Sequence, residues 1–253
     1  VRRVLREDGT AWLNLGDSYA SGGASGPQGA TGDRASRTYT AEGLGAGARD
    51  HGCKPKDLVG IPWRVAFALQ ADGWYLRQDI IWHKPNPMPE SVTDRCTKAH
   101  EYVFLLSKSA RYWYDAAAIA QDADPANHRE SRGIRRTPPG QQDHKGWKDG
   151  RHHETRNRRD VWTIPSKPYS GAHFATMPPK LARLCILAGC PAGGIVLDPF
   201  GGAGTTALEA MKQGRDAVIC ELNPDYAELA RIRLLDDAPM FNSVALESAR
   251  GTG

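Results

Sequence analysis

The sequence predicts an α/β protein of the doubly wound type, with a mostly parallel sheet and helices on both faces. Two observations lead to this prediction. Apolar and β-branched runs alternate along the 253-residue chain with segments whose apolar residues recur at helical spacing. In addition, the stretch 195–223 combines a strand pattern, a glycine-rich turn, a helix pattern, a second strand pattern and an acidic residue.

The stretch 195–223 divides into elements with clear boundaries. Ile195–Leu197 is a short apolar run that suits a buried strand, and Gly214 is a plausible stop for the helix that follows. Between them lie the glycine-rich turn 201–204 and a helical pattern over 205–213, and a second apolar run follows over 217–220. This order predicts a β-α-β unit with an acid, Glu221, at the end of its second strand.

Such a unit suits a nucleotide-like ligand. Glycines let the backbone turn sharply and let a ligand approach, and the first turn of a helix offers free N–H groups. Glu221 follows Gly201 by about 20 residues, where an acid can bind ribose hydroxyls. The spacing does not fit G-x-G-x-x-G, and the chain has no G-x-x-x-x-G-K-[ST] phosphate loop. The alternative is an ordinary β-α-β turn without a ligand.

The sequence Asp198–Thr206, D-P-F-G-G-A-G-T-T, closely resembles the D-P-F-x-G-x-G-T-T motif of DNA amino-methyltransferases. These enzymes methylate the exocyclic nitrogen of adenine or cytosine with S-adenosylmethionine. The resemblance implies a Rossmann-like methyltransferase fold. It also implies the following cofactor-binding residues: Asp198, Pro199, Phe200, Gly201, Gly202, Gly204, Thr205, Thr206, Glu221 and Asn223. In that family the glycine turn wraps the amino-acid part of the cofactor, and the acid holds the ribose.

The N-terminal part predicts a helix end followed by a strand. Val1–Asp8 has the spacing of the last turns of an amphipathic helix, and Ala11–Leu15 is a short strand candidate. In the resembled family a strand ending in N-x-G-D-x-Y lies beside the cofactor and the target base. Asn14 and Asp17 are therefore candidate pocket residues, with a strand end and an Asx turn as the equal alternative.

The next part predicts one helix and three strands, which span 56–72, 74–83, 99–107 and 112–115. The block D-I-I-W-H-K-P-N-P-M-P, followed by K-A-H-E-Y-V-F-L-L-S-K, also resembles the methyltransferase family. There it forms later strands of the sheet and the rim of the base pocket. Lys84 and Asn86 are accordingly predicted to contact DNA, although solvated surface residues are the simpler reading of either one.

Residues 121–160 form a basic, nearly apolar-free segment that cannot bury a core. The resembled family carries a variable target-recognition segment at this place, and basic side chains suit phosphate contact. A solvated charged insertion is the alternative. The predicted DNA-binding residues of this segment are Arg129, Arg132, Arg135, Arg136, Lys145, Lys148, Arg156, Arg158 and Arg159.

The chain then returns to a core pattern. A strand is expected at 161–165 and helices at 179–189 and 224–235. His173, Phe174 and Ala175 resemble a family turn that touches the methionine part of the cofactor, although they would serve equally as a helix cap. By these patterns the chain divides into 1–120 with a glycine-rich loop at 20–56, the basic segment 121–160, the cofactor-binding half 161–236 and a tail at 237–253.

The amino-acid composition limits the kinds of partner that the protein can have. The net charge of +4 and pI near 8.8 permit a nucleic-acid partner. The five cysteines form no C-x-x-C pair, so no disulfide framework or metal site is predicted. No apolar run is long enough to cross a membrane. A cytoplasmic protein of prokaryotic or phage origin is expected, acting on double-stranded DNA with a restriction endonuclease as a possible partner.

One expected motif is absent. The family places a [Ser/Asp/Asn]-Pro-Pro-[Tyr/Phe/Trp] loop against the target base, and neither Pro-Pro pair here, at 138–139 and 178–179, has the acceptor and the aromatic residue. In the class whose cofactor motif comes late, this loop precedes the strand that carries Asn14, so we expect it upstream of Val1 and expect this chain alone to be inactive or very weak. The predicted function is methyl transfer to cytosine N4, with adenine N6 as the alternative. Other classes remain open: a non-catalytic DNA- or RNA-binding module with a retained cofactor fold, or an enzyme acting on RNA or a small molecule.

Overall fold

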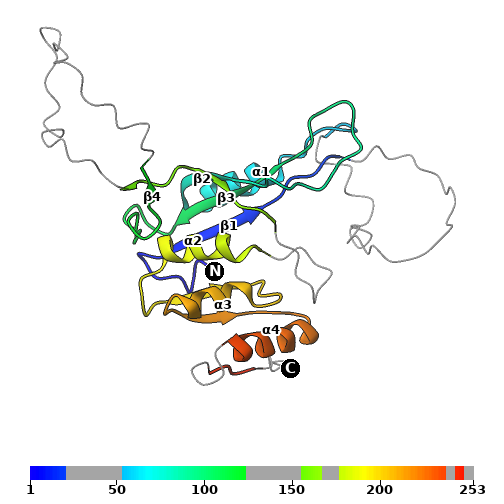
Figure 1. Ribbon diagram of the computed structural model, residues 1–253. Helices are drawn as coiled ribbons and strands as arrows, with labels where there is room; N and C mark the ends of the chain where they lie inside the picture. The colour runs from blue at the N-terminus through cyan, green and yellow to red at the C-terminus, as the bar shows by residue number, and fades with distance from the viewer. Residues whose placement is uncertain (21–52, 124–154, 167–176, 238–242, 248–253) are drawn as a thin grey trace, which may run out of the picture.

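The computed structural model describes residues 1–20, 53–123, 155–166, 177–237 and 243–247 (Figure 1). The described chain combines strands and helices, as the sequence predicts. In chain order its elements are β1 (Thr10–Leu15), α1 (Ile61–Ala71), β2 (Tyr75–His83), β3 (His100–Ser107), β4 (Gln121–Asp122), β5 (Thr155–Arg156), β6 (Val161–Thr163), α2 (Pro179–Gly189), β7 (Ile195–Asp198), α3 (Thr205–Lys212), β8 (Asp216–Ile219) and α4 (Pro224–Asp237).

The larger sheet has the strand order β1-β3-β2-β6. β3 runs antiparallel to both of its neighbours, while β2 and β6 are parallel. The sequence predicted a mostly parallel sheet, and this detail is wrong for β3. Its cause is the connection 84–99, which contains three prolines and no helix, so the chain reverses directly from β2 into β3 instead of crossing over the sheet.

Helices cover both faces of this sheet, as predicted. On one face, Trp63 of α1 packs edge-on against Tyr102 and Phe104 of β3. On the other face, α2 contributes Leu181, Leu184 and Ala188 to the main core cluster, which also contains Ile80, Trp82, Val103, Ile119, Trp162 and Ile164. Successive residues of β3 thus point into two different layers, which is the alternation that a strand buried on both sides requires.

The smaller sheet pairs β7 and β8 in parallel over four residues each. α3 connects the two strands and covers one face, where Ala207 and Leu208 pack with Leu234 of α4. On the other face Ile195, Leu197 and Val218 are 68%, 39% and 52% exposed. Among the described residues no strand of this sheet pairs with a strand of the larger one.

α2 lies between the two sheets and packs against both of them (Figure 1). Its residues Leu181, Leu184 and Ala188 face the larger sheet. Ala182 and Ile186 instead pack with Ala210 of α3 and with Val196 of β7. The helix therefore joins the larger sheet to the β7–β8 unit through two of its faces.

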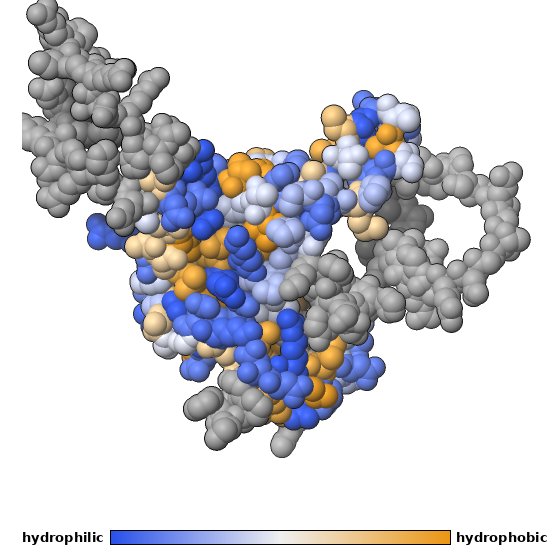
Figure 2. Space-filling model, viewed as in Figure 1, coloured by the Kyte–Doolittle hydropathy of each residue, from blue (hydrophilic) through white to orange (hydrophobic). Residues whose placement is uncertain are grey.

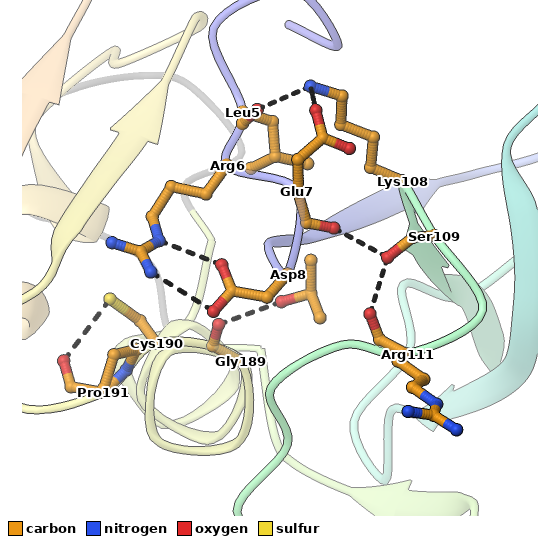
Figure 3. Close-up of polar contacts among 11 residues, drawn as sticks. Leu5, Arg6, Glu7, Asp8, Lys108, Ser109, Arg111, Gly189, Cys190 and Pro191 are labelled. Atoms are coloured by element: carbon orange, nitrogen blue, oxygen red, sulfur yellow. Dashed lines mark hydrogen bonds and ion pairs between the residues drawn. The ribbon is translucent and has the colours of Figure 1, made fainter.

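Residues 1–8 form turns and not a continuous helix end, although the N–H of Leu5 donates to the carbonyl oxygen of Val1 at 3.1 Å and closes one helical turn. Tertiary contacts also hold this segment, because Lys108 donates to the carbonyl oxygen of Leu5 and Ser109 donates to that of Glu7 (Figure 3). Val4 in this segment is 65% exposed. The segment is therefore held against the end of β3.

Two further boundaries differ from the prediction. The helix expected from residue 56 begins at Ile61, after Gly60 in the left-handed conformation. The short strand expected at 112–115 is absent from the described chain, where Tyr112 packs on Tyr114 and stacks beside Arg77. The sequence assigned β6 and α2 to the cofactor-binding half, but both pack with the larger sheet. The predicted boundary at residue 160 therefore does not separate two hydrophobic cores.

Candidate cofactor and nucleic-acid sites

The glycine turn between β7 and α3 is tightly packed against the elements around it. Gly204 has φ of +74°, and a Cβ added there would lie 2.9 Å from the Cβ of Ala230 in α4. A Cβ added to Gly201 would lie 2.8 Å from the Cβ of Ile219 in β8. Glycine is therefore required at Gly204 both by conformation and by space, and at Gly201 by space alone.

Asp198 organises the start of this turn. One carboxylate oxygen accepts a hydrogen bond from the backbone N–H of Phe200 at 3.0 Å. The other accepts from the hydroxyl of Thr206 at 2.6 Å, which ties the end of β7 to the first turn of α3. Thr205 is nearly buried, and its hydroxyl accepts from Arg233 of α4 at 3.0 Å. Thr205 thus serves the packing of α4, whereas Thr206 lies in the Asp198 network.

Glu221 lies across the turn, just after β8. Its Oε2 accepts from the backbone N–H of Gly202 at 2.7 Å, and its Oε1 accepts from that of Asn223 at 2.9 Å. The side chain of Asn223 in turn accepts from the N–H of Asp225 in the first turn of α4. The structure therefore brings Asp198, the glycine turn, Glu221 and Asn223 together at the carboxyl ends of two adjacent parallel strands.

Two large apolar side chains flank this group without being buried. Phe200 is 86% exposed, and Leu222, between Glu221 and Asn223, is 99% exposed. Phe200 was predicted from the motif, but Leu222 was not. The available signal was an apolar residue placed directly after the strand-ending acid, where a turn residue is usually polar.

A second polar cluster lies at the carboxyl ends of β1 and β2. Asn14 donates to Glu101 Oε2 at 3.1 Å and to the carbonyl oxygen of Tyr102 at 3.0 Å. Lys84 forms an ion pair with Glu101, and its ammonium lies 4.4 Å from the ring centroid of Trp82. Asn14 and Lys84 were predicted from the sequence, whereas Glu101, the residue that connects them, was not.

Asp17 and Asn86 both hold neighbouring chain segments together. Asp17 Oδ1 accepts from the backbone N–H groups of Gly60 and Ile61, at the start of α1. Asn86 donates to the carbonyl oxygen of Ser166 and accepts from its N–H, at 3.1 and 3.0 Å. Both side chains thus have structural partners, and the predicted pocket and DNA roles stay predictions.

The basic segment is described only at its edges. β4 pairs antiparallel with β5, which brings residues 121–122 beside 155–156. Arg158 Nε donates to the carbonyl oxygen of Ile119 at 2.7 Å, and partial burial lowers the pKa of its guanidinium. Arg159 is exposed, and Arg156 has a buried Nε without a hydrogen-bond partner in the described chain. Of these three arginines, Arg159 is the one most open to an external anion.

Several predicted residues lie outside the described residues. They are the cofactor candidates His173, Phe174 and Ala175 and the DNA-binding candidates Arg129, Arg132, Arg135, Arg136, Lys145 and Lys148. Within the described ranges, no group of three His, Cys, Asp or Glu side chains is arranged to hold a metal ion. A search of the same ranges finds no helix both long and apolar enough to cross a membrane.

The comparison with known families decides which kind of protein carries this geometry. Residues 1–231 match the family described as DNA methylase, N6_N4_Mtase. The chain belongs to this family. The match covers both sheets and the glycine turn, so the resemblance noted from a nine-residue motif extends over most of the sequence.

Individual relatives of this DNA methylase agree. The chain is 48% identical over 240 residues to the type II methyltransferase M.SmaI of Serratia marcescens, covering 93% of this chain and 70% of the relative. It is 46% identical to M.Cfr9I of Citrobacter freundii, covering 92% of this chain and 67% of that protein. The chain therefore spans about two thirds of the length of these relatives.

Solved structures confirm the Rossmann-like fold. The PvuII DNA methyltransferase, described as cytosine-N4-specific, superposes with a TM-score of 0.60 at 18% identity, covering 92% of this chain and 66% of that chain. A putative DNA modification methylase of Thermus thermophilus, TTHA0409, complexed with S-adenosyl-L-methionine, gives 0.53 at 22% identity and covers 95% of this chain and 74% of that one. The predicted family, fold and S-adenosylmethionine cofactor are thereby confirmed, while individual site residues stay predictions.

Proposed function

We propose that this DNA methylase binds S-adenosylmethionine at the β7–α3 turn and takes part in methyl transfer to an exocyclic amino group of a base flipped out of double-stranded DNA. The observation that carries the proposal is the pair of carboxylates, Asp198 and Glu221, held by backbone N–H groups on either side of the glycine turn. Together they form a polar, preorganised cradle at the carboxyl ends of parallel strands, where α/β proteins bind nucleotides.

Each residue of the cradle has a role that follows from its contacts. An ionised carboxylate has about four lone-pair positions. Glu221 uses two of them on Gly202 and Asn223, which leaves acceptor capacity for the two hydroxyls of a ribose. Asp198 offers negative charge near an ammonium group, and the exposed Phe200 and Leu222 offer apolar surface to a ring. When bound, S-adenosylmethionine supplies the activated methyl group.

The protein must also align the methyl group of the cofactor with the target amino group of the base. Transfer of a methyl group from a sulfonium to a nitrogen is an in-line displacement, which depends on positioning and electrostatics. A base inside a duplex cannot be reached, so it must be flipped and hydrogen-bonded in a pocket. The cluster of Asn14, Glu101 and Lys84 is the polar group that we assign to the wall of this pocket, because it lies at the carboxyl ends of β1 and β2.

We propose cytosine N4 as the target, with adenine N6 as the alternative. The block D-I-I-W-H-K-P-N-P favours cytosine, and one protein that shares the fold is described as cytosine-N4-specific. The chain contains no [Ser/Asp/Asn]-Pro-Pro-aromatic sequence, which in this family binds the target amino group. We therefore expect little or no transfer by this chain alone.

The biological setting is part of the same proposal. M.SmaI and M.Cfr9I are named type II methyltransferases, which supports a protective role beside a restriction endonuclease. Both come from bacteria, which supports a cytoplasmic protein of a prokaryotic host. The exposed Arg159 and the basic segment that precedes it support duplex DNA as the partner.

The test has two separate readouts. Binding of S-adenosylmethionine to the chain is measured by calorimetry, and transfer of labelled methyl groups to unmethylated duplex DNA is followed by digestion to nucleosides. Cofactor binding without transfer is expected for this chain, and label in N4-methylcytosine is expected when it is extended to the length of its relatives. Label in N6-methyladenine would decide for the alternative base. Absence of cofactor binding would contradict the proposed site.

A second candidate is a non-catalytic DNA-binding module that retains the cofactor fold. The missing Pro-Pro-aromatic motif is the observation that favours it. This candidate predicts salt-dependent duplex binding in both the chain and its extended form, with no methyl transfer by either. The extended form therefore separates the two functions.

A further inference from the structure

The loop that joins β2 to β3 is part of a lobe that projects from the end of the larger sheet (Figures 1 and 2). We define the projecting lobe as residues 17–20, 53–60 and 84–99. The first two segments pair through Tyr19 and Leu58, and backbone hydrogen bonds join Ala20 to Asp57 and Lys56. The lobe begins where β1 and β2 end, so it lies at the edge of the sheet that carries Asn14, Lys84 and Glu101.

Arg95 fastens the 84–99 loop to the rest of the lobe. Its guanidinium stacks 3.9 Å from the ring centroid of Tyr19 and pairs with Glu90 at 2.5 Å, with both charged side chains only 27% and 30% exposed. Asn86 ties the start of the same loop to Ser166. Lys84 N–H donates to the carbonyl oxygen of Ala99 and closes the base. The loop is thus held at both ends and in its middle.

Met88 stands at the exposed part of this fastened loop. Its side chain is 85% exposed, and it lies between Pro87 and Pro89, whose rings fix φ on either side. A large apolar side chain gains nothing from such exposure in water. Because the loop holds the exposed Met88 side chain in a fixed position, we infer that this side chain contacts an apolar surface of a binding partner.

Two cations of the lobe are paired with carboxylates of the lobe itself. Arg95 pairs with Glu90, and Lys56 pairs with Asp94 at 2.8 Å, so these two cations are matched by carboxylates within the lobe. Met88 is the most exposed large apolar side chain of the lobe, at 85%, ahead of Leu58 at 52% and Tyr19 at 37%. In a DNA-binding protein the apolar surface that suits it is the face of a base, because apolar side chains such as Met and Pro act as wedges between base steps.

We propose that Met88 is a wedge that enters the DNA base stack beside the flipped base and stabilises the opened duplex. This inference rests on the proposed function, since it requires a duplex bound at the carboxyl end of the larger sheet. Pro87 and Pro89 hold the backbone of the wedge, and Arg95 holds the loop against the strain of insertion. Met88 acts on the stack and takes no part in the transfer of the methyl group.

The test uses the full chain and three variants, Met88→Ala, Met88→Leu and Val4→Ala. Val4 is a matched control, because it is 65% exposed and precedes β1, at the opposite end of that strand from the lobe. Short duplexes are first recovered from a random pool by binding to the wild-type chain with S-adenosylmethionine present. Affinity is then measured by fluorescence anisotropy and bending by energy transfer between the duplex ends, for the paired duplex and for the same duplex with one mispaired base.

Met88→Ala is expected to weaken binding to the paired duplex about tenfold and to reduce bending, with a smaller loss on the mispaired duplex, whose stack is already weakened. Met88→Leu and Val4→Ala are expected to match the wild type. If Met88→Ala binds and bends DNA as Val4→Ala does, the wedge is overturned while the proposed function stands. If the wild-type chain recovers no duplex at all, both the DNA-binding part of the proposed function and the wedge fail.

Discussion

The carboxylate of Glu221 accepts a hydrogen bond from the backbone N–H of Gly202 at 2.7 Å, which joins the glycine turn between β7 and α3 to the chain just after β8. Glu221 is therefore fixed in place by the turn before any ligand arrives. A preorganised acceptor of this kind loses little conformational entropy on binding, which strengthens each hydrogen bond it makes.

Replacing Glu221 with Gln is expected to weaken S-adenosylmethionine binding by at least about tenfold, because the charge is lost and one acceptor becomes a donor. Calorimetric titration measures the change. Asp216→Asn is the matched control, since Asp216 is an exposed acid at the other end of β8. Equal losses in the two variants would show that Glu221 has no specific contact with the cofactor.

Substitutions at Gly204 and Gly214 separate the cost of a strained backbone conformation from the cost of steric overlap with a neighbouring residue. Both have positive φ, +74° and +69°, but a Cβ meets Ala230 at Gly204 and nothing within 4 Å at Gly214. Gly214→Ala should lower the free energy of unfolding by about 1 kcal/mol through conformation alone. Gly204→Ala should cost roughly 2–3 kcal/mol, because overpacking is added. Urea unfolding measures both, and equal costs would mean that α4 moves to make room.

Arg183 of α2 and Glu209 of α3 form an ion pair at 2.8 Å, in which Glu209 is 2% exposed and Arg183 47% exposed. Arg183→Met is expected to cost about 2–3 kcal/mol of unfolding free energy, because a buried carboxylate loses its partner. The double variant Arg183→Met, Glu209→Leu should recover most of this loss. A double-mutant cycle by thermal unfolding checks the coupling, and additive effects would contradict it.

The sequence predicted the fold class, but it did not predict the order of the strands in the larger sheet. Strand patterns show which residues are buried but not which strand is the neighbour, and β3 inserts between β1 and β2 through long-range pairing that no local pattern encodes. The placement of residues 1–8 also depends on distant residues, because Lys108 and Ser109 donate to the carbonyl oxygens of Leu5 and Glu7. Local patterns do not report such contacts.

The cofactor turn was predictable because its chemistry is local. Asp198, the glycines and Thr206 lie within nine residues, and the bonds that join them span short sequence separations. The role of Glu101 was less visible, because it connects Asn14 and Lys84, which lie 87 and 17 residues away along the chain. Sequence spacing reveals a turn, whereas a cluster of side chains from three strands requires the fold.

Cys185 provides a pH-dependent prediction. It packs partly buried against the main core, and burial raises the pKa of its thiol from 9.0 to about 12. Between these values the folded chain keeps a proton that the unfolded chain loses, so stability is full below about pH 9 and falls by about 1.4 kcal/mol per pH unit above it. Cys185→Ala should remove this part of the slope in urea unfolding series. An unchanged slope in that variant would show that the thiol titrates normally.

Arg158 and Arg159 are neighbours in sequence but differ in environment. Arg159→Ala is expected to weaken duplex binding and to reduce the slope of log affinity against log salt by about 1, as loss of one phosphate contact would. Arg158→Ala should leave that slope unchanged and lower the unfolding temperature, since Arg158 holds Ile119. Titrations at several salt concentrations separate the two, and a slope change for Arg158 alone would reverse the assignment.

The position of α2 has a mechanical consequence. The described strands of the two sheets share no backbone hydrogen bonds. Because α2 packs on both sheets, it connects the β7–β8 unit mechanically to the sheet assigned to the target base. Binding of the cofactor at the glycine turn should therefore change how α2 packs on the larger sheet. Amide exchange along Pro179–Gly189 is the place to look for it, as protection that rises when the cofactor is added.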